Sequence, residues 1–326
     1  MLRDECKRWH SCPAPAILRC PLTGYDEVVE PTELSWQSKL ILLLVLPAVA
    51  VDVVFQAYWW TLQAAHVAIW TIGLSAVLGL VACAMRSATP GAAVTGAAIT
   101  ASIMFSTATV PYLPWHTGLI PVLAVLILTS LATRLGRRRK QHLGTAESHK
   151  GRKSVQVAAN LGIATLLYCQ PAQSWQFDQG WLRLAGLAPT AVFIAGLAAL
   201  CEAAADTVSS ELGQVLSGRP RMITTLRIAR AGTDGAISLG GTLAGIGTAA
   251  VVAAAGALAL RGDSVMLVVS CLGGIFGLFF DSLLGATLER RTLLNNHAVN
   301  FLSTLSASAF ALILLALIAH SSHPLH

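Results

Sequence analysis

The chain has 326 residues, of which 55% are hydrophobic and only 12% are charged, and its mean hydropathy is +0.65. Soluble domains carry about 25% charged residues, so this composition excludes an ordinary soluble protein and indicates a polytopic membrane protein. The formal net charge of +6 comes from a few basic loops. That pattern is typical of membrane topology, so we expect no nucleic acid as a partner.

Residues 1–36 are polar, and we expect a cytoplasmic segment there, followed by a single transmembrane catalytic domain at residues 37–322. The apolar runs are continuous and rich in Ala, Leu and Gly, which favours an all-α helical bundle over a β-barrel. We predict nine transmembrane helices, at 38–58, 63–85, 90–110, 116–135, 154–171, 182–205, 236–260, 264–287 and 298–319.

The basic residues follow alternate predicted helices. They are Arg86, then a run from Arg137 to Lys153, then arginines at 219–230, and then Arg290 and Arg291. A cytoplasmic N terminus places all of these loops inside the cell. We therefore expect the protein in the plasma (inner) membrane, with its site on the cytoplasmic face.

The sixth predicted helix ends in a run of acidic and small residues. Glu202 and Asp206 are four residues apart and share a helix face, which continues through Ser210. Two carboxylates one turn apart repel each other unless a cation or basic group lies between them, so this pair suggests a functional site. A helix end that emerges into water, with ordinary solvated acids, is the alternative.

Two further segments carry polar residues that we expect at the same cytoplasmic edge of the membrane. Gly232 to Gly235 precede a predicted helix, and a glycine-rich helix start beside arginines suits phosphate, although a capped helix packed through glycines would look the same. Asp281 interrupts a stripe of glycines, so we expect it to face the protein interior and to need a metal ion, a basic residue or a proton. A structural hydrogen bond is the alternative.

The fifth predicted helix enters the membrane with three polar residues on one face. Arg152, Gln156 and Asn160 are spaced four apart, and Asn300 lies about one turn inside the last helix. The chain contains neither a P-loop motif nor a GxGxxG dinucleotide-binding motif. Residue patterns alone therefore indicate a polar membrane-edge site without naming its chemistry.

Several motifs in order resemble the transmembrane protein 19 family, which includes the chloroplast phytyl-phosphate kinase of tocopherol synthesis. They are ADTVSSELG, MITT, GTDGAISLGGTLAG, FDSLLGATLE and NNHAVNFLS, within a resemblance that covers roughly residues 38–320. The GTNGG-like element of that family reads Gly-Thr-Asp-Gly-Ala at 232–236, a mild departure at Ala236.

The resemblance implies an isoprenoid lipid kinase. It would transfer a phosphoryl group from a nucleoside triphosphate, CTP being the expected donor, to phytyl, geranylgeranyl or farnesyl phosphate. Asp206 and Asp281, joined by Glu202 or Glu211, would hold Mg²⁺, and Lys140 and Arg152 would neutralise phosphates. Phosphate and nucleotide contacts would come from Gln156, Asn160, Ser210, Arg227, Gly232, Thr233, Asp234, Gly235, Ser238 and Asn300.

Two other functions remain open at this point. A prenyl alcohol kinase or a CDP-lipid cytidylyltransferase would use the same reactants differently. An ion-coupled transporter would use Asp206 and Asp281 as ion sites, but the polar residues gather at one face rather than at the midplane. The sequence also leaves open the chain length of the lipid, the nucleotide, and whether the chain forms a homo-oligomer.

Overall fold

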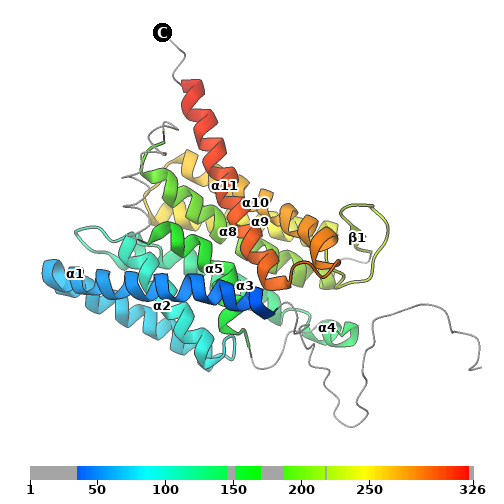
Figure 1. Ribbon diagram of the computed structural model, residues 1–326, viewed down its shortest axis with the longest axis horizontal. Helices are drawn as coiled ribbons and strands as arrows, with labels where there is room; N and C mark the ends of the chain where they lie inside the picture. Colours follow the sequence, from blue (N-terminus) through cyan, green and yellow to red (C-terminus); the bar gives the residue numbers. More distant parts are fainter. Residues whose placement is uncertain (1–34, 145–150, 170–186, 217–218, 323–326) are drawn as a thin grey trace, which may run out of the picture.

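A computed structural model describes residues 35–144, 151–169, 187–216 and 219–322, so nearly all of the predicted N-terminal segment lies outside the described residues. The described chain is a bundle of helices, which confirms the predicted all-α membrane fold (Figure 1). The α-helices are α1 (Ser35–Ala84), α2 (Pro90–Ser106), α3 (Leu119–Arg134), α4 (Arg137–Leu143), α5 (Ser154–Tyr168), α8 (Thr190–Leu216), α9 (Leu239–Ala259), α10 (Ser264–Leu284) and α11 (Asn296–Ser322).

The remaining elements are short. A 3₁₀ turn, η2, covers Pro114–His116, and a π-helical turn, η3, extends α10 over Gly285–Glu289. The strands β1 (Arg221–Met222) and β2 (Ala236–Ile237) pair antiparallel in the loop between α8 and α9. This loop and η3 are the irregular elements that concern the site.

The helix α1 consists of two arms. Ala64 has non-helical backbone angles (φ −159°, ψ 81°), and the chain turns back there, so the second arm runs beside the first (Figure 1). Val53 on the first arm and Ala68 on the second pack in one apolar cluster with Phe105 of α2. The first two predicted membrane segments are therefore the two arms of α1.

The helix α8 lies at the centre of the bundle. It packs against α3, α5, α9, α10 and α11, and its apolar half is almost entirely buried. Small side chains make this packing close: Ala195, Ala198 and Ala199 have no exposed surface. The helix continues past the predicted membrane segment at 182–205 and ends at Leu216, almost three turns beyond Asp206.

The described helices that are long enough to cross a membrane number fewer than the nine predicted segments when the two arms of α1 are counted as one helix. Five of the described helices are long and apolar enough to cross a membrane, or six if α3 and α4, bent by 62°, form one span. The helices α2 and α5 have 17 and 15 residues, about 25 and 22 Å at the α-helical rise, which is short of a hydrocarbon core of roughly 30 Å. Nine crossings therefore stay a prediction.

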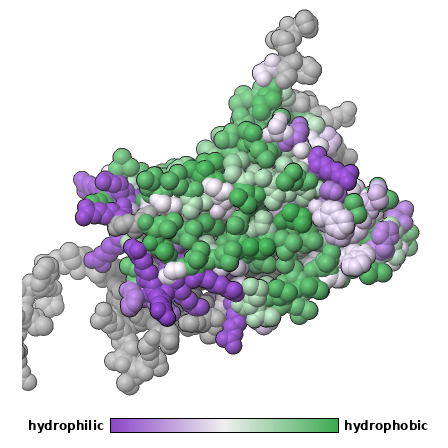
Figure 2. All heavy atoms as spheres, turned by 180° about the vertical axis from the view of Figure 1, so that it is seen from behind, coloured by the Kyte–Doolittle hydropathy of each residue, from purple (hydrophilic) through white to green (hydrophobic). Residues whose placement is uncertain are grey.

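The surface has a broad apolar band with hydrophilic residues at both ends (Figure 2). At one end, where α4 and β1 lie in Figure 1, distant segments meet. Arg139 donates to the carbonyl oxygen of Val215 at 2.9 Å, and Gln37 donates to that of Leu293 at 2.9 Å. We call this end the polar edge, defined by residues 85–89, 134–144, 151–153, 211–216, 219–237 and 285–295.

Candidate active site

Four carboxylates from α8, α10 and η3 come together just inside the polar edge. Asp206 lies within hydrogen-bonding range of Asp281, and Glu202 and Glu289 act electrostatically on the same aspartate. We call Glu202, Asp206, Asp281 and Glu289 the acidic cluster. The structure therefore brings together three of the four predicted metal ligands.

Glycines on α10 let this cluster form. A Cβ atom at Gly277 would lie 2.5 Å from Cγ of Glu202, and one at Gly274 would lie 2.5 Å from Cβ of Cys201. The backbones of α8 and α10 thus approach more closely than side chains on α10 would allow. The prediction that Asp281 faces the interior from a glycine stripe is confirmed.

Two oxygens of the acidic cluster are buried without a hydrogen-bond partner among the described residues: Oε1 of Glu202 and Oδ2 of Asp281. Ser303 of α11 lies beside both carboxyl groups, but its hydroxyl donates to the carbonyl oxygen of Asn300 at 2.9 Å. Such oxygens are costly in a membrane interior unless a cation, a proton or a donor from a ligand reaches them.

The donor set suits Mg²⁺, which prefers carboxylate oxygens and keeps open positions for substrate phosphates and water. Within the described part of the chain, however, no three His, Cys, Asp or Glu side chains already stand as a metal-binding group. One or two carboxylates would therefore hold such an ion only together with oxygens from a ligand.

Arg152 borders the acidic cluster and acts electrostatically on Asp206. Its backbone is fixed by pairing with the loop after α1: its N–H donates to the carbonyl oxygen of Ser87, and its carbonyl oxygen accepts from Thr89, both at 3.0 Å. Gly151, with φ of +76°, makes this approach possible, because a Cβ atom there would lie 2.8 Å from the backbone of that loop.

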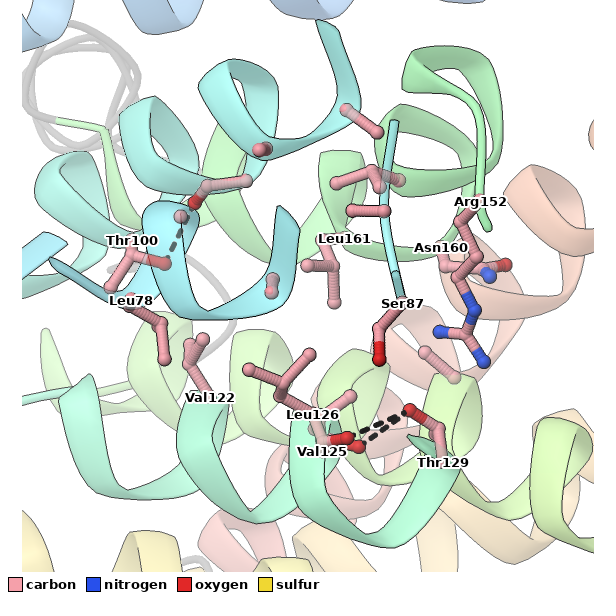
Figure 3. A pocket seen from close by; sticks show the side chains of 18 residues that line it. Leu78, Ser87, Thr100, Val122, Val125, Leu126, Thr129, Arg152, Asn160 and Leu161 are labelled. Carbon is pink, nitrogen blue, oxygen red and sulfur yellow. Dashed lines mark hydrogen bonds between the residues drawn. The ribbon is translucent and has the colours of Figure 1, made fainter. Parts of the chain in front are cut away.

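A pocket opens on the other side of Arg152. It is partly open to the outside and lies between the second arm of α1 and the helices α2, α3 and α5. Arg152, Asn160, Ser87 and Thr129 lie at one end, and apolar side chains such as Val122 line the other (Figure 3). Arg152 therefore contributes to both the pocket and the acidic cluster.

The loop at residues 232–235, which we call the glycine loop, lies against η3. A Cβ atom at Gly235 would lie 2.3 Å from the backbone nitrogen of Ala286, and Gly235 has φ of +74°. Asp234 reaches Arg290 and Glu289. Partial burial raises the pKa of Asp234, and Arg290 opposes that rise. The loop thus lies beside η3, which carries Glu289 of the acidic cluster.

The helix after this loop begins later than residues 232–235, so neither Thr233 nor Asp234 caps it. Ser238 caps α9, accepting from the N–H of Gly241 at 3.2 Å, because Ala236 and Ile237 pair with β1 first. Gly232 has φ of +82° and lies in the exposed part of this loop.

Lys140 is not placed to neutralise a phosphate. Its side chain is 1% exposed, and its ammonium group pairs with Glu211 at 2.5 Å and donates to the carbonyl oxygens of Ala132 and Thr133. Both predicted roles change with this ion pair: Lys140 joins α4 to α3 and α8, and Glu211 binds it instead of joining the acidic cluster.

The remaining predicted residues have mixed outcomes. Gln156 caps α5 by accepting from the N–H of Lys153 at 2.7 Å, whereas Asn300 donates to Asn160 at 2.7 Å beside the pocket. Ser210 donates to the carbonyl oxygen of Thr207. Ser210 and Arg227 lie on exposed surface, as do Gly232 and Asp234.

Two members of the site were not predicted. Glu289 interacts with Asp206, Asp234 and Asn296, and Ser303 lies beside Glu202 and Asp281. Glu289 follows Asp281 by eight residues, about two helical turns, which could have placed both on one face. Ser303 carried no comparable signal, because a serine within a membrane helix is ordinary.

Comparison with known proteins identifies the family. The family model of the integral membrane protein DUF92 matches residues 73–308, which is most of the chain and includes the acidic cluster. The chain belongs to this family. The resemblance inferred from the motifs is confirmed, because two plant proteins that match, VTE6 and PGR, are members of the same family.

The relatives of this family member come from distant organisms. An uncharacterized membrane protein of Methanocaldococcus jannaschii is 37% identical over 187 residues, 57% of this chain and 71% of that protein. One of Synechocystis is 30% identical over 211 residues, 61% of this chain and 74% of that protein. The chloroplastic protein VTE6 of Arabidopsis thaliana is 27% identical over 201 residues, 60% of this chain and 58% of VTE6. No solved structure matches the chain.

Proposed function

We propose that this protein is a prenyl-phosphate kinase, which uses a nucleoside triphosphate to convert an isoprenyl monophosphate into the diphosphate at the cytoplasmic face of the membrane. The observation that carries the proposal is the position of Arg152. It lies between an apolar pocket and a cluster of carboxylates with unpartnered oxygens. A lipid phosphate and a metal–nucleotide complex would meet at such a point.

The chemistry asks mainly for charge and positioning. An oxygen of the acceptor phosphate forms a bond to the γ-phosphorus, the bond from that phosphorus to the β–γ bridging oxygen breaks, and the electron pair leaves with the nucleoside diphosphate. The acceptor is already an anion, so no strong general base is required. This agrees with a site made of acids, Arg152 and amides.

Each part of the site has a defined task. When bound, Mg²⁺ would be held by Asp206 and Asp281 and would neutralise charge on the triphosphate. Arg152 would bind the acceptor phosphate through two parallel hydrogen bonds. Asn160 and Asn300 would orient phosphate oxygens, and the loop at 232–235 would cover the nucleotide.

The family supports the proposal at a coarser level. The resemblance is to a family that includes the chloroplast phytyl-phosphate kinase, and the chloroplastic protein VTE6 is among the relatives at 27% identity. CTP as donor is what the resemblance implies, Mg²⁺ as metal follows from the carboxylates, and the cytoplasmic orientation follows from the basic loops; all three are parts of the proposal.

The test is product analysis with the purified chain in nanodiscs. CTP labelled in the γ-phosphate is supplied with geranylgeranyl, phytyl or farnesyl phosphate, and ATP, GTP and UTP are compared. The proposal expects label in the prenyl diphosphate and formation of CDP. Pyrophosphate release would indicate a cytidylyltransferase, and solute transport in liposomes without nucleotide turnover would indicate a transporter.

A further inference from the structure

The pocket beside Arg152 is more apolar than its list of residues suggests, because its threonine hydroxyls already have hydrogen-bond partners. Thr100 donates to the carbonyl oxygen of Gly96 at 2.7 Å, and Thr129 donates to those of Val125 and Leu126 (Figure 3). The hydroxyls of both lining threonines are therefore engaged within their own helices. A ligand in the deep part of the pocket meets methyl and methylene groups and finds no donor seeking a partner.

The pocket also has a direction. Thr129 lies at its polar end and Val122 at its apolar end (Figure 3), seven residues apart along α3, which is about 10 Å. Arg152 is at the polar end, where it also faces Asp206. A molecule that fits this pocket has an anionic head and an uncharged hydrocarbon chain that runs into the bundle.

We propose that this pocket holds the first isoprene units of the acceptor lipid, with its phosphate at Arg152, and that α2 sets the width available to the chain. The proposal rests on the proposed kinase function and specifies where its lipid substrate binds. The wall in question is Gly96, which lines the pocket from the middle of α2.

Gly96 offers a precise way to fill the pocket. A Cβ atom there would meet only Cγ1 of Val157, at 3.9 Å, which is ordinary contact. Glycine in a helix interior is also unfavourable relative to residues with a side chain. Gly96→Leu should therefore be tolerated by the protein while its side chain occupies the space assigned to the lipid. Gly73→Leu is the matched control, because nothing lies within 4 Å of a Cβ atom there and Gly73 faces outward from α1.

The experiment measures KM for two acceptors, geranylgeranyl phosphate and the shorter geranyl phosphate. Gly96→Leu should raise KM for geranylgeranyl phosphate at least about 10-fold, the effect of misplacing a few methylene groups. It should leave KM for CTP unchanged, and Gly73→Leu should behave as the wild type. An unchanged KM for geranylgeranyl phosphate, or an equal loss in Gly73→Leu, would overturn the proposal.

A second readout separates this inference from the kinase proposal. A prenyl phosphate that carries a diazirine in its second isoprene unit is photolysed with the wild-type chain, and labelled peptides are mapped by mass spectrometry. Label in α2 and α3, reduced by Gly96→Leu, supports the pocket even if no kinase turnover is found. Label confined to the outer surface of the bundle would refute the pocket while leaving the kinase reaction standing. If Gly96→Leu does not fold, Leu126→Phe fills the opposite wall and decides by the same criteria.

Discussion

Two groups of buried acids lie in this bundle, and they are built differently. Asp52 of α1 is fully buried, but Ser102 donates to it at 2.5 Å and Gln56 at 3.2 Å, and Gln56 in turn donates to Ser106. In the acidic cluster, by contrast, buried oxygens of Glu202 and Asp281 have no donor among the described residues.

This difference in hydrogen-bond donors distinguishes a structural acid from acids that suit a functional site. Both sites place acids inside apolar helices. A carboxylate with its donors in place joins two helices, whereas carboxylates with unpartnered oxygens would gain from a bound cation or from a donor on a ligand. The comparison therefore predicts opposite responses to removal of the acid.

The largest effect is expected from Asp281→Asn and, separately, Asp206→Asn. Each should lower prenyl-phosphate kinase turnover by at least about 100-fold, because charge that stabilises the transferring phosphoryl group is lost. The thermal unfolding midpoint should stay the same or rise, since repulsion in the cluster is relieved. Turnover and unfolding are measured on the same preparation, and near-normal turnover in either variant would remove that aspartate from the mechanism.

Arg152→Gln should weaken binding of the acceptor, the prenyl phosphate. We expect KM for the prenyl phosphate to rise by about 10-fold to 100-fold, because the loss of a charge-assisted phosphate contact costs about 1.5–3 kcal/mol. The KM for the nucleotide should change much less. Arg152→Lys is the control for charge without the planar fork, and an equal rise in both KM values would contradict the assignment.

Lys140→Met tests the buried ion pair with Glu211. Breaking such a pair leaves one buried charge, and we expect a loss of about 3–5 kcal/mol in the free energy of unfolding. Turnover per folded molecule should be retained. The double variant Lys140→Met with Glu211→Leu should recover most of the stability. A soluble, stable Lys140→Met protein without activity would instead support the catalytic role that the sequence predicts for Lys140.

The smallest effect is expected from Asp52→Ala. Gln56 and Ser102 lose their acceptor, which should cost about 1–3 kcal/mol of stability. Kinase turnover should be unchanged, the reverse of Asp281→Asn. The same pair of assays checks this variant, and a loss of turnover without a loss of stability would erase the distinction between the two groups of acids.

What the sequence could predict depends on the range of the interactions involved. Asp281 among glycines at helical spacing predicts an interior acid, because the pattern is contained in one helix. The pairing of Lys140 with Glu211 was missed, since it depends on how α4 packs on α8. The start of α9 at Leu239 was also missed, because β1 competes for the preceding residues.

The central claim is that the acidic cluster receives a metal–nucleotide ligand and the Asp52 group does not. Binding of CTP in the presence of Mg²⁺, measured by isothermal titration calorimetry on the wild type, Asp281→Asn and Asp52→Ala, tests it most directly. The account predicts Mg²⁺-dependent binding by the wild type and by Asp52→Ala, and loss of that binding in Asp281→Asn. Equal CTP affinity in all three proteins, or binding that does not depend on Mg²⁺, would contradict it.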